Sequence, residues 1–167
     1  MLGSREGAAD DQLFSKMSAF KTKSSLHRAS LDLAVGMINP DELKGLREMF
    51  ESMDTGGNGI LETSELKAAF KKQGVKMDKK QLDKIIKELD HNRSGQINYR
   101  EFLTATVDVS KHMTENKMRS IFSKFDTDCS GNITRENVHT AMQKLGRDIT
   151  EQEVTEIMDK HDKSNDG

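Results

Sequence analysis

Four short segments rich in oxygen-bearing side chains begin at Asp54, Asp90, Asp126 and Asp162, each 36 residues after the one before. Within each segment, oxygen-bearing side chains mostly occupy the first, third and fifth positions, and a glycine occupies the sixth. Calcium takes about six to eight oxygen ligands, the glycine makes the sharp turn around the ion, and a glutamate at the twelfth position supplies two oxygens at once. The segments therefore have the residue types and the spacing that calcium coordination requires.

This spacing is that of the EF-hand loop, and four loops at a constant period argue against a chance match. For the first loop the candidate ligands are Asp54, Asn58, the Ile60 carbonyl, Glu62 and Glu65. For the second loop they are Asp90, Asn92, Ser94, the Gln96 carbonyl, Asn98 and Glu101. For the third loop they are Asp126, Asp128, Ser130, Asn132 and Asn137, and for the fourth Asp162, Ser164 and Asp166.

The loops differ in completeness, so we expect two stronger calcium sites, in the loops at Asp54 and Asp90. The second loop is the most complete, although its few carboxylates should moderate its affinity. The first loop has Gly56 at position three, where no side-chain oxygen is available, and Glu62 partly restores the charge. In the third loop Asn137 replaces the glutamate, which predicts weak binding, magnesium, or a loop kept only for folding. The fourth loop stops at Gly167 and is expected to be truncated and incomplete.

Helical patterns flank every loop, so we predict an all-α fold of EF-hand pairs. Capping boxes are expected where Asp78 precedes Gln81 and where Thr150 precedes Glu153. Paired loops meet through a short two-stranded contact, which predicts Leu61 opposite Ile97. We expect an N-terminal pair over residues 39–110 and a C-terminal pair over 111–167 that is truncated within the fourth loop.

Composition narrows the class of protein further. The 167 residues carry a net charge of −2, which argues against non-specific nucleic-acid binding. No apolar run approaches the length of a transmembrane helix. The single cysteine, Cys129, excludes a disulfide framework within the chain and favours a reducing cytoplasm.

Residues 1–11 are expected to be a flexible end or a cloning remnant. The five scattered histidines form no catalytic or metal-binding pattern, so we expect no catalytic residues.

A basic segment precedes the loops. Over 12–38, apolar residues recur at roughly helical spacing, and no acidic residue occurs between Gln12 and Leu31. We predict one long amphipathic helix there, with partner contacts made by Phe14, Met17, Phe20, Lys21, Lys23 and Leu31. Such a helix is typical of a calmodulin-type target or a membrane-surface element. An ordinary surface helix is the simpler alternative.

The segment from Met17 to Leu31, followed by a first EF-hand loop, resembles the junction of the calcium-dependent protein kinases of plants and apicomplexan parasites. The resemblance implies a Ser/Thr kinase domain joined through an autoinhibitory junction helix to calmodulin-like EF-hands. It implies that the kinase domain in cis and the junction helix are the partners, with calcium as the controlling ion. This chain has no kinase glycine-rich loop, His-Arg-Asp or Asp-Phe-Gly motif, so we expect a regulatory fragment and not an enzyme. A free-standing calcium sensor or buffer is the alternative.

Overall fold

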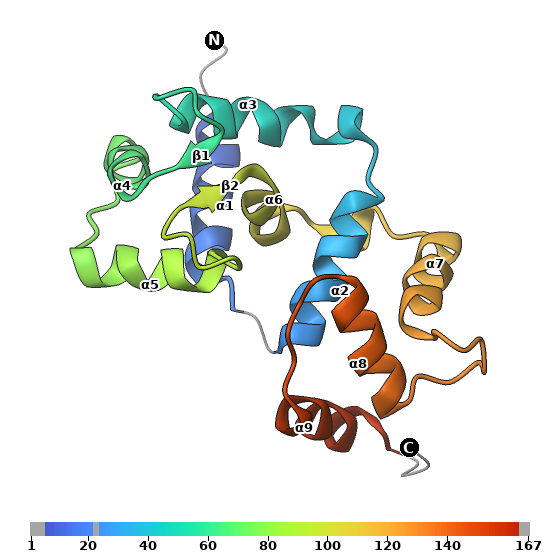
Figure 1. Ribbon diagram of the computed structural model, residues 1–167. Helices are drawn as coiled ribbons and strands as arrows, with labels where there is room; N and C mark the ends of the chain where they lie inside the picture. Colours follow the sequence, from blue (N-terminus) through green and yellow to red (C-terminus); the bar gives the residue numbers. More distant parts are fainter. Residues whose placement is uncertain (1–5, 22–23, 164–167) are drawn as a thin grey trace. The chain divides into compact units, whose positions relative to one another are not determined.

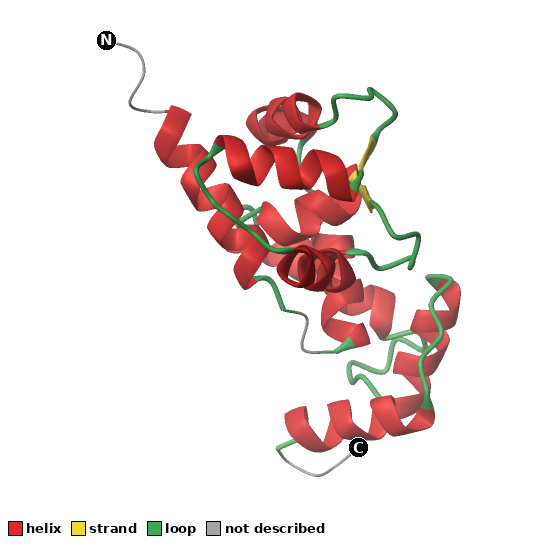
Figure 2. Cartoon of the chain, turned by 90° about the vertical axis from the view of Figure 1, so that its left-hand side faces the viewer, coloured by secondary structure: helices red, strands yellow, loops and turns green. Residues whose placement is uncertain are grey.

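The computed structural model describes residues 6–21 and 24–163, and these residues are largely helical (Figure 2). The α-helices are α1 (Glu6–Ala19), α2 (Ser25–Gly36), α3 (Lys44–Met53), α4 (Thr63–Lys72), α5 (Lys79–Leu89), α6 (Tyr99–Thr106), α7 (Glu115–Phe125), α8 (Arg135–Lys144) and α9 (Glu151–His161). Short 3-10 helices are η1 (Pro40–Leu43) and η2 (Val109–Lys111), and the strands are β1 (Ile60–Leu61) and β2 (Ile97–Asn98).

The chain divides into two compact units, and each contains one of the first two helices. The N-terminal unit comprises described residues 6–21 and 38–107, and the C-terminal unit comprises 24–37 and 108–163. The boundary between the EF-hand parts falls between Val107 and Asp108, slightly before the expected boundary at 110. Both units are therefore built from segments that are distant in sequence.

In the N-terminal unit, the strand contact between the first two loops confirms the predicted pairing. Strands β1 and β2 lie side by side (Figure 1) and pair antiparallel, with Leu61 opposite Ile97. Both side chains are fully buried. Next to this ladder, the Phe50 ring of α3 meets the Phe102 ring of α6 edge-on, with centroids 5.3 Å apart. The two helix–loop–helix motifs thus share one apolar core, because neither can bury its hydrophobic face alone.

The expectation of one helix over residues 12–38 was wrong. Two helices replace it: α1 begins at Glu6, inside the segment expected to be a flexible end, and α2 begins at Ser25. Ser24 has an extended backbone, and its hydroxyl accepts a hydrogen bond from the His27 N–H at 3.1 Å. A serine in this N-cap conformation starts a new helix, so one continuous helix does not run through Ser24.

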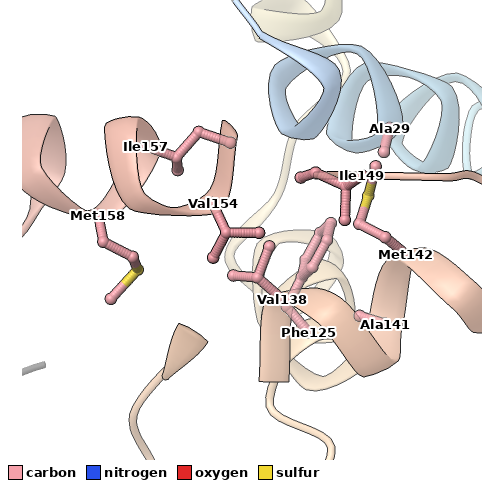
Figure 3. Close-up of a cluster of buried hydrophobic side chains, with 9 residues drawn as sticks. All are labelled: Ala29, Phe125, Val138, Ala141, Met142, Ile149, Val154, Ile157 and Met158. Atoms are coloured by element: carbon pink, nitrogen blue, oxygen red, sulfur yellow. The ribbon is translucent and has the colours of Figure 1, made fainter. Parts of the chain in front are cut away.

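In the C-terminal unit, α2 contributes directly to the apolar core (Figure 3). Ala29 of α2 is 1% exposed and lies beside Met142 and Ile149. Leu26 and Leu33, also from α2, are partly buried and pack against the same cluster. The other members of the cluster are Phe125, Val138, Ala141, Val154, Ile157 and Met158. Because α2 completes this core, it is part of the unit and not an accessory on its surface.

The predicted capping boxes at Asp78 and Thr150 are both present. At the second of them, Glu153 accepts from the Thr150 backbone N–H at 2.9 Å and from the Ser25 hydroxyl of α2 at 3.0 Å. The hydrogen bond from the Thr150 backbone, chiefly, lowers the pKa of Glu153. The carboxylate therefore joins the start of α9 to the start of α2.

We predict that Glu153→Gln lowers the free energy of unfolding of the C-terminal unit by about 1 kcal/mol at neutral pH. Because the folded-state pKa of Glu153 lies below its unfolded value, its contribution is present above the ordinary glutamate pKa and is lost as pH falls through the lowered value. Urea titrations from pH 7 downward should therefore show the gap between wild type and variant closing in acid. Exposed Glu151→Gln is the control, and a gap that does not change with pH would contradict this assignment.

Candidate metal centre: the acidic loops

The second loop brings ligand oxygens from its first, fifth and seventh positions together. The Ser94 hydroxyl oxygen lies 3.4 Å from Asp90 Oδ1 and 3.0 Å from the Gln96 carbonyl oxygen. Oxygens bound to one calcium ion lie about 3 Å apart, given metal–oxygen bonds of about 2.4 Å. The Asp90 carboxylate is also oriented by the Ser94 and Gly95 N–H groups. Hydrogen bonds from Ser94 therefore hold three of the candidate ligand oxygens of the second loop close to one another.

Glu101 closes this loop from the following helix. It is 4% exposed, and its two carboxylate oxygens accept from opposite ends of the loop. Oε1 accepts from the His91 N–H at 2.8 Å, and Oε2 accepts from the Asn98 N–H at 2.9 Å. Asn98 is the N-cap of α6 and Glu101 is its N3 residue, so one capping box also places the ninth and twelfth ligand positions. Helix capping thus fixes the two side chains that occupy the ninth and twelfth positions of the loop.

The first loop has a similar frame with a gap at position three. Asp54 accepts from the Gly59 N–H at 2.7 Å, and Glu65 accepts from the Gly56 N–H at 2.9 Å and the Glu62 N–H at 2.9 Å. The hydrogen bond from Glu62, chiefly, lowers the pKa of Glu65, so this carboxylate is held ionised. A Cβ at Gly56 would lie 3.5 Å from Glu65 Oε1, an ordinary contact. The gap in the ligand set is therefore one of chemistry, since space for a side chain exists.

The third loop has the same early geometry but a different closure. The Ser130 hydroxyl lies 3.4 Å from Asp126 Oδ1 and 3.2 Å from the Asn132 carbonyl, and a hydrogen bond from Ser130 lowers the pKa of Asp128. Asn137 is 3% exposed, and its Oδ1 accepts from the Thr134 N–H at 3.0 Å. Its Nδ2 donates to the Thr127 hydroxyl at 3.0 Å. An amide N–H group has no lone pair for a cation, so this residue closes the loop and offers at most one neutral oxygen.

Backbone conformation explains why glycine occupies the sixth position of the first three loops. Gly59, Gly95 and Gly131, at position six of their loops, have φ of 79°, 81° and 86°, a left-handed conformation that favours glycine. At position four, Arg93 and Cys129 are also left-handed, with φ of 57° and 56°. Cys129 is exposed, and position four of the loop is not a ligand position. The three loops therefore share one backbone path.

Of the candidate ligands of the fourth loop, only Asp162 lies within the described residues, as the C-cap of α9. Ser164 and Asp166 lie outside them. Among described residues, no three His, Cys, Asp or Glu side chains converge on a common point. Any bound cation would therefore depend on amide, hydroxyl and carbonyl oxygens as well as on paired carboxylates. Calcium accepts such mixed oxygen sets.

The predicted partner residues of the basic segment have different environments. Met17 is fully buried in the N-terminal unit, and Phe14 packs on Phe70 of α4 with ring centroids 4.6 Å apart. Phe20 and Leu31 are half-buried, Lys21 is exposed, and Lys23 lies outside the described residues. The sequence analysis did not select Lys16, whose Nζ donates to the Thr106 carbonyl at 3.2 Å. It also did not select Ala29, whose small side chain gives no amphipathic signal.

Helix α1 therefore lies against the EF-hand helices of the N-terminal unit. It packs along α6 and α5 (Figure 1). Leu13 and Phe14 border a cavity of about 200 Å³ that Met49 and Met53 of α3 also line. Lys16 places its positive charge at the C-terminal end of α6, where the helix dipole favours a cation. The unit thus holds α1 through the apolar contacts of Leu13, Phe14 and Met17 and through the hydrogen bond from Lys16.

One known protein family matches both segments of the chain that contain the loops. The family described as "EF-hand domain pair" matches residues 43–107 and 115–167, more than half of the chain. The chain belongs to the EF-hand family. Its two matched segments are the parts of the two units that carry the loops.

Individual relatives are calcium-dependent protein kinases. Calcium-dependent protein kinase 19 of Oryza sativa subsp. japonica is 32% identical over 100 residues, which cover 57% of this chain and 19% of that protein. Calcium-dependent protein kinase 2 of Zea mays is 32% identical over 90 residues, 54% of this chain and 18% of that protein. Calcium-dependent protein kinase 34 of Arabidopsis thaliana is 30% identical over 90 residues, covering 54% and 17%.

This EF-hand chain therefore matches less than a fifth of the length of each of these relatives. Within the described residues, no helix has the length and apolar content that crossing a bilayer requires.

Proposed function

We propose that this chain is the calcium-sensing regulatory region of a cytoplasmic Ser/Thr protein kinase, and that its EF-hand units act by capturing the basic N-terminal segment. The kinase domain would be its partner in cis. The observation that carries this proposal is the burial of both N-terminal helices, with Met17 in one unit and Ala29 in the other. The relatives named as calcium-dependent protein kinases support the same role.

The side chains of the segment explain how it would be held. Phe14 and Met17 remove apolar surface from water in the N-terminal unit, and Lys16 fixes the direction of α1 on α6. In the C-terminal unit Ala29 allows close approach of α2 to Met142. When bound, calcium supplies the coordination energy that opens EF-hand helix pairs and exposes such apolar grooves. A segment held in this way would not be available to block a kinase domain.

The proposal is tested by hydrogen exchange on the whole chain, with calcium and with a chelator. Calcium should slow exchange of amides in 6–19 and 25–36 if the units capture these helices only in the loaded state. A chain of the buffer class would load calcium without that change, because buffer EF-hands barely open. Equal protection of both helices in the two conditions would overturn the proposal.

We also propose that the strength of the sites follows the chemistry of the twelfth position, with the second loop strongest. Replacing Asn137 by Glu should raise the calcium affinity of the third loop about tenfold, since a carboxylate replaces an amide that presents an N–H group. Isothermal titration calorimetry would show an additional site. Asn137→Gln is the matched control, because it lengthens the side chain without adding charge, and an equal gain in that variant would contradict the charge argument.

A further inference from the structure

Helix α2 makes a charged contact with the C-terminal unit in addition to its apolar contacts. The Asp32 carboxylate of α2 accepts a hydrogen bond from the Arg147 guanidinium, which lies in the connection between α8 and α9. The two side chains are only 14% and 25% exposed. Asp32 is also the only acidic residue between Gln12 and Pro40, in a segment otherwise basic or neutral. The negative charge of Asp32 is therefore paired with the positive charge of Arg147 in a largely buried environment.

The position of Arg147 has an exact counterpart in the N-terminal unit because of the internal repeat. Arg147 follows a left-handed glycine and donates its backbone N–H to the Met142 carbonyl at 3.0 Å. Val75 follows a left-handed glycine in the same way and donates to the Phe70 carbonyl at 3.0 Å. The two residues are separated by twice the 36-residue period, since 147 − 75 = 72. Valine thus stands in one unit where arginine stands in the other.

This difference gives the two units different affinities for a helix that carries a carboxylate. Burial, and secondarily the nearby Arg28 guanidinium, lowers the pKa of Arg147. Arg28 belongs to α2 itself, so docking of α2 brings a second cation near Arg147, and the Asp32 carboxylate of the same helix offsets that repulsion. In the equivalent place of the N-terminal unit stands Val75, which is 37% exposed and whose side chain cannot donate a hydrogen bond to a carboxylate. Attraction at one unit, without a matching donor at the other, produces selectivity.

We propose that the Asp32–Arg147 ion pair directs α2 to the C-terminal EF-hand pair in preference to the N-terminal one. The inference rests on the proposed capture of the basic segment and adds a determinant of which half enters which unit. Ser25 supports the same placement, because its hydroxyl donates to Glu153 at the other end of the contact at 3.0 Å. Asp32 and Arg147 are positioning residues, and neither belongs to a calcium-binding loop.

A charge-swap cycle on the whole chain in saturating calcium tests the ion pair. Asp32→Arg and Arg147→Asp should each speed amide exchange of 25–36 about tenfold, because each leaves a charge without its partner. The double variant D32R/R147D should return exchange close to the wild-type rate while 6–19 stays unchanged in all variants. The control Lys144→Asp, a charge reversal at an exposed position of α8, should leave 25–36 unchanged. Unaltered exchange in both single variants, or a double variant as fast as the singles, would overturn the proposal.

A photo-cross-linking amino acid at position 33 tests selectivity directly, since Leu33 packs against the core cluster of the C-terminal unit. In wild-type background, cross-links should map to 108–163. Asp32→Arg should shift a several-fold larger share to 38–107, and D32R/R147D should restore the original distribution. Cross-links that stay confined to 108–163 in Asp32→Arg would show that the Asp32–Arg147 ion pair does not select between the two units. Failure of capture itself is a separate result, because it would appear as equal exchange of the wild-type helices with calcium and with chelator.

Discussion

Replacing Glu101 by Gln is expected to weaken calcium binding at the second loop about 100-fold, equivalent to about 3 kcal/mol. Glu101 is 4% exposed, and its carboxylate joins both ends of the loop through the His91 and Asn98 N–H groups. The amide keeps the shape of the side chain but halves its acceptor capacity and removes its charge. Calorimetric titration of the whole chain measures the loss.

The control for this experiment is Asp83→Asn, which removes the same charge from an exposed position on α5 outside the loop. It should leave the affinity within about twofold of wild type, because exposed charges are screened by salt. In a complete kinase, Glu101→Gln should raise the calcium concentration needed for activation. If Glu101→Gln loses no more calcium affinity than Asp83→Asn, the second loop is not the strongest calcium site.

The second large effect is expected at Phe14, the aromatic residue through which α1 contacts the N-terminal unit. Phe14→Ala should lower the free energy of unfolding of that unit by about 3 kcal/mol, because it deletes a buried ring that packs at a tilt against the ring of Phe70. Tyr99 is the only tyrosine of the chain and lies in this unit, with its ring 5.3 Å from that of Phe50. Tyrosine fluorescence during urea unfolding therefore reports this unit selectively.

Ser15→Ala is the matched control for Phe14, since Ser15 is the next residue of α1 and is exposed. It should change the free energy of unfolding by no more than about 0.5 kcal/mol. If α1 is captured only in calcium, the effect of Phe14→Ala should shrink when a chelator is present. A full effect in the chelator would mean that α1 belongs to the unit permanently and does not act as a switched segment.

The local features of the fold could be predicted from the sequence because their causes lie within a few residues. Capping boxes at Asp78 and Thr150 depend on side chains three positions apart. The loop positions follow from the stereochemistry of one ion and one glycine turn. The pairing of Leu61 with Ile97 needed only one further step, since the repeat fixes which residues occupy equivalent positions.

The division of the basic segment was decided by tertiary structure. Its periodicity is compatible with one helix, but the Ser24 cap and two separate hydrophobic cores favour two. Ala29 is small and gives no sequence signal, yet it is 1% exposed in the core that contains Phe125 and Met142. Asp32 and Arg147 are 115 residues apart, so no local pattern relates them. Local chemistry thus specifies the loops, whereas long-range packing assigns each N-terminal helix to its unit.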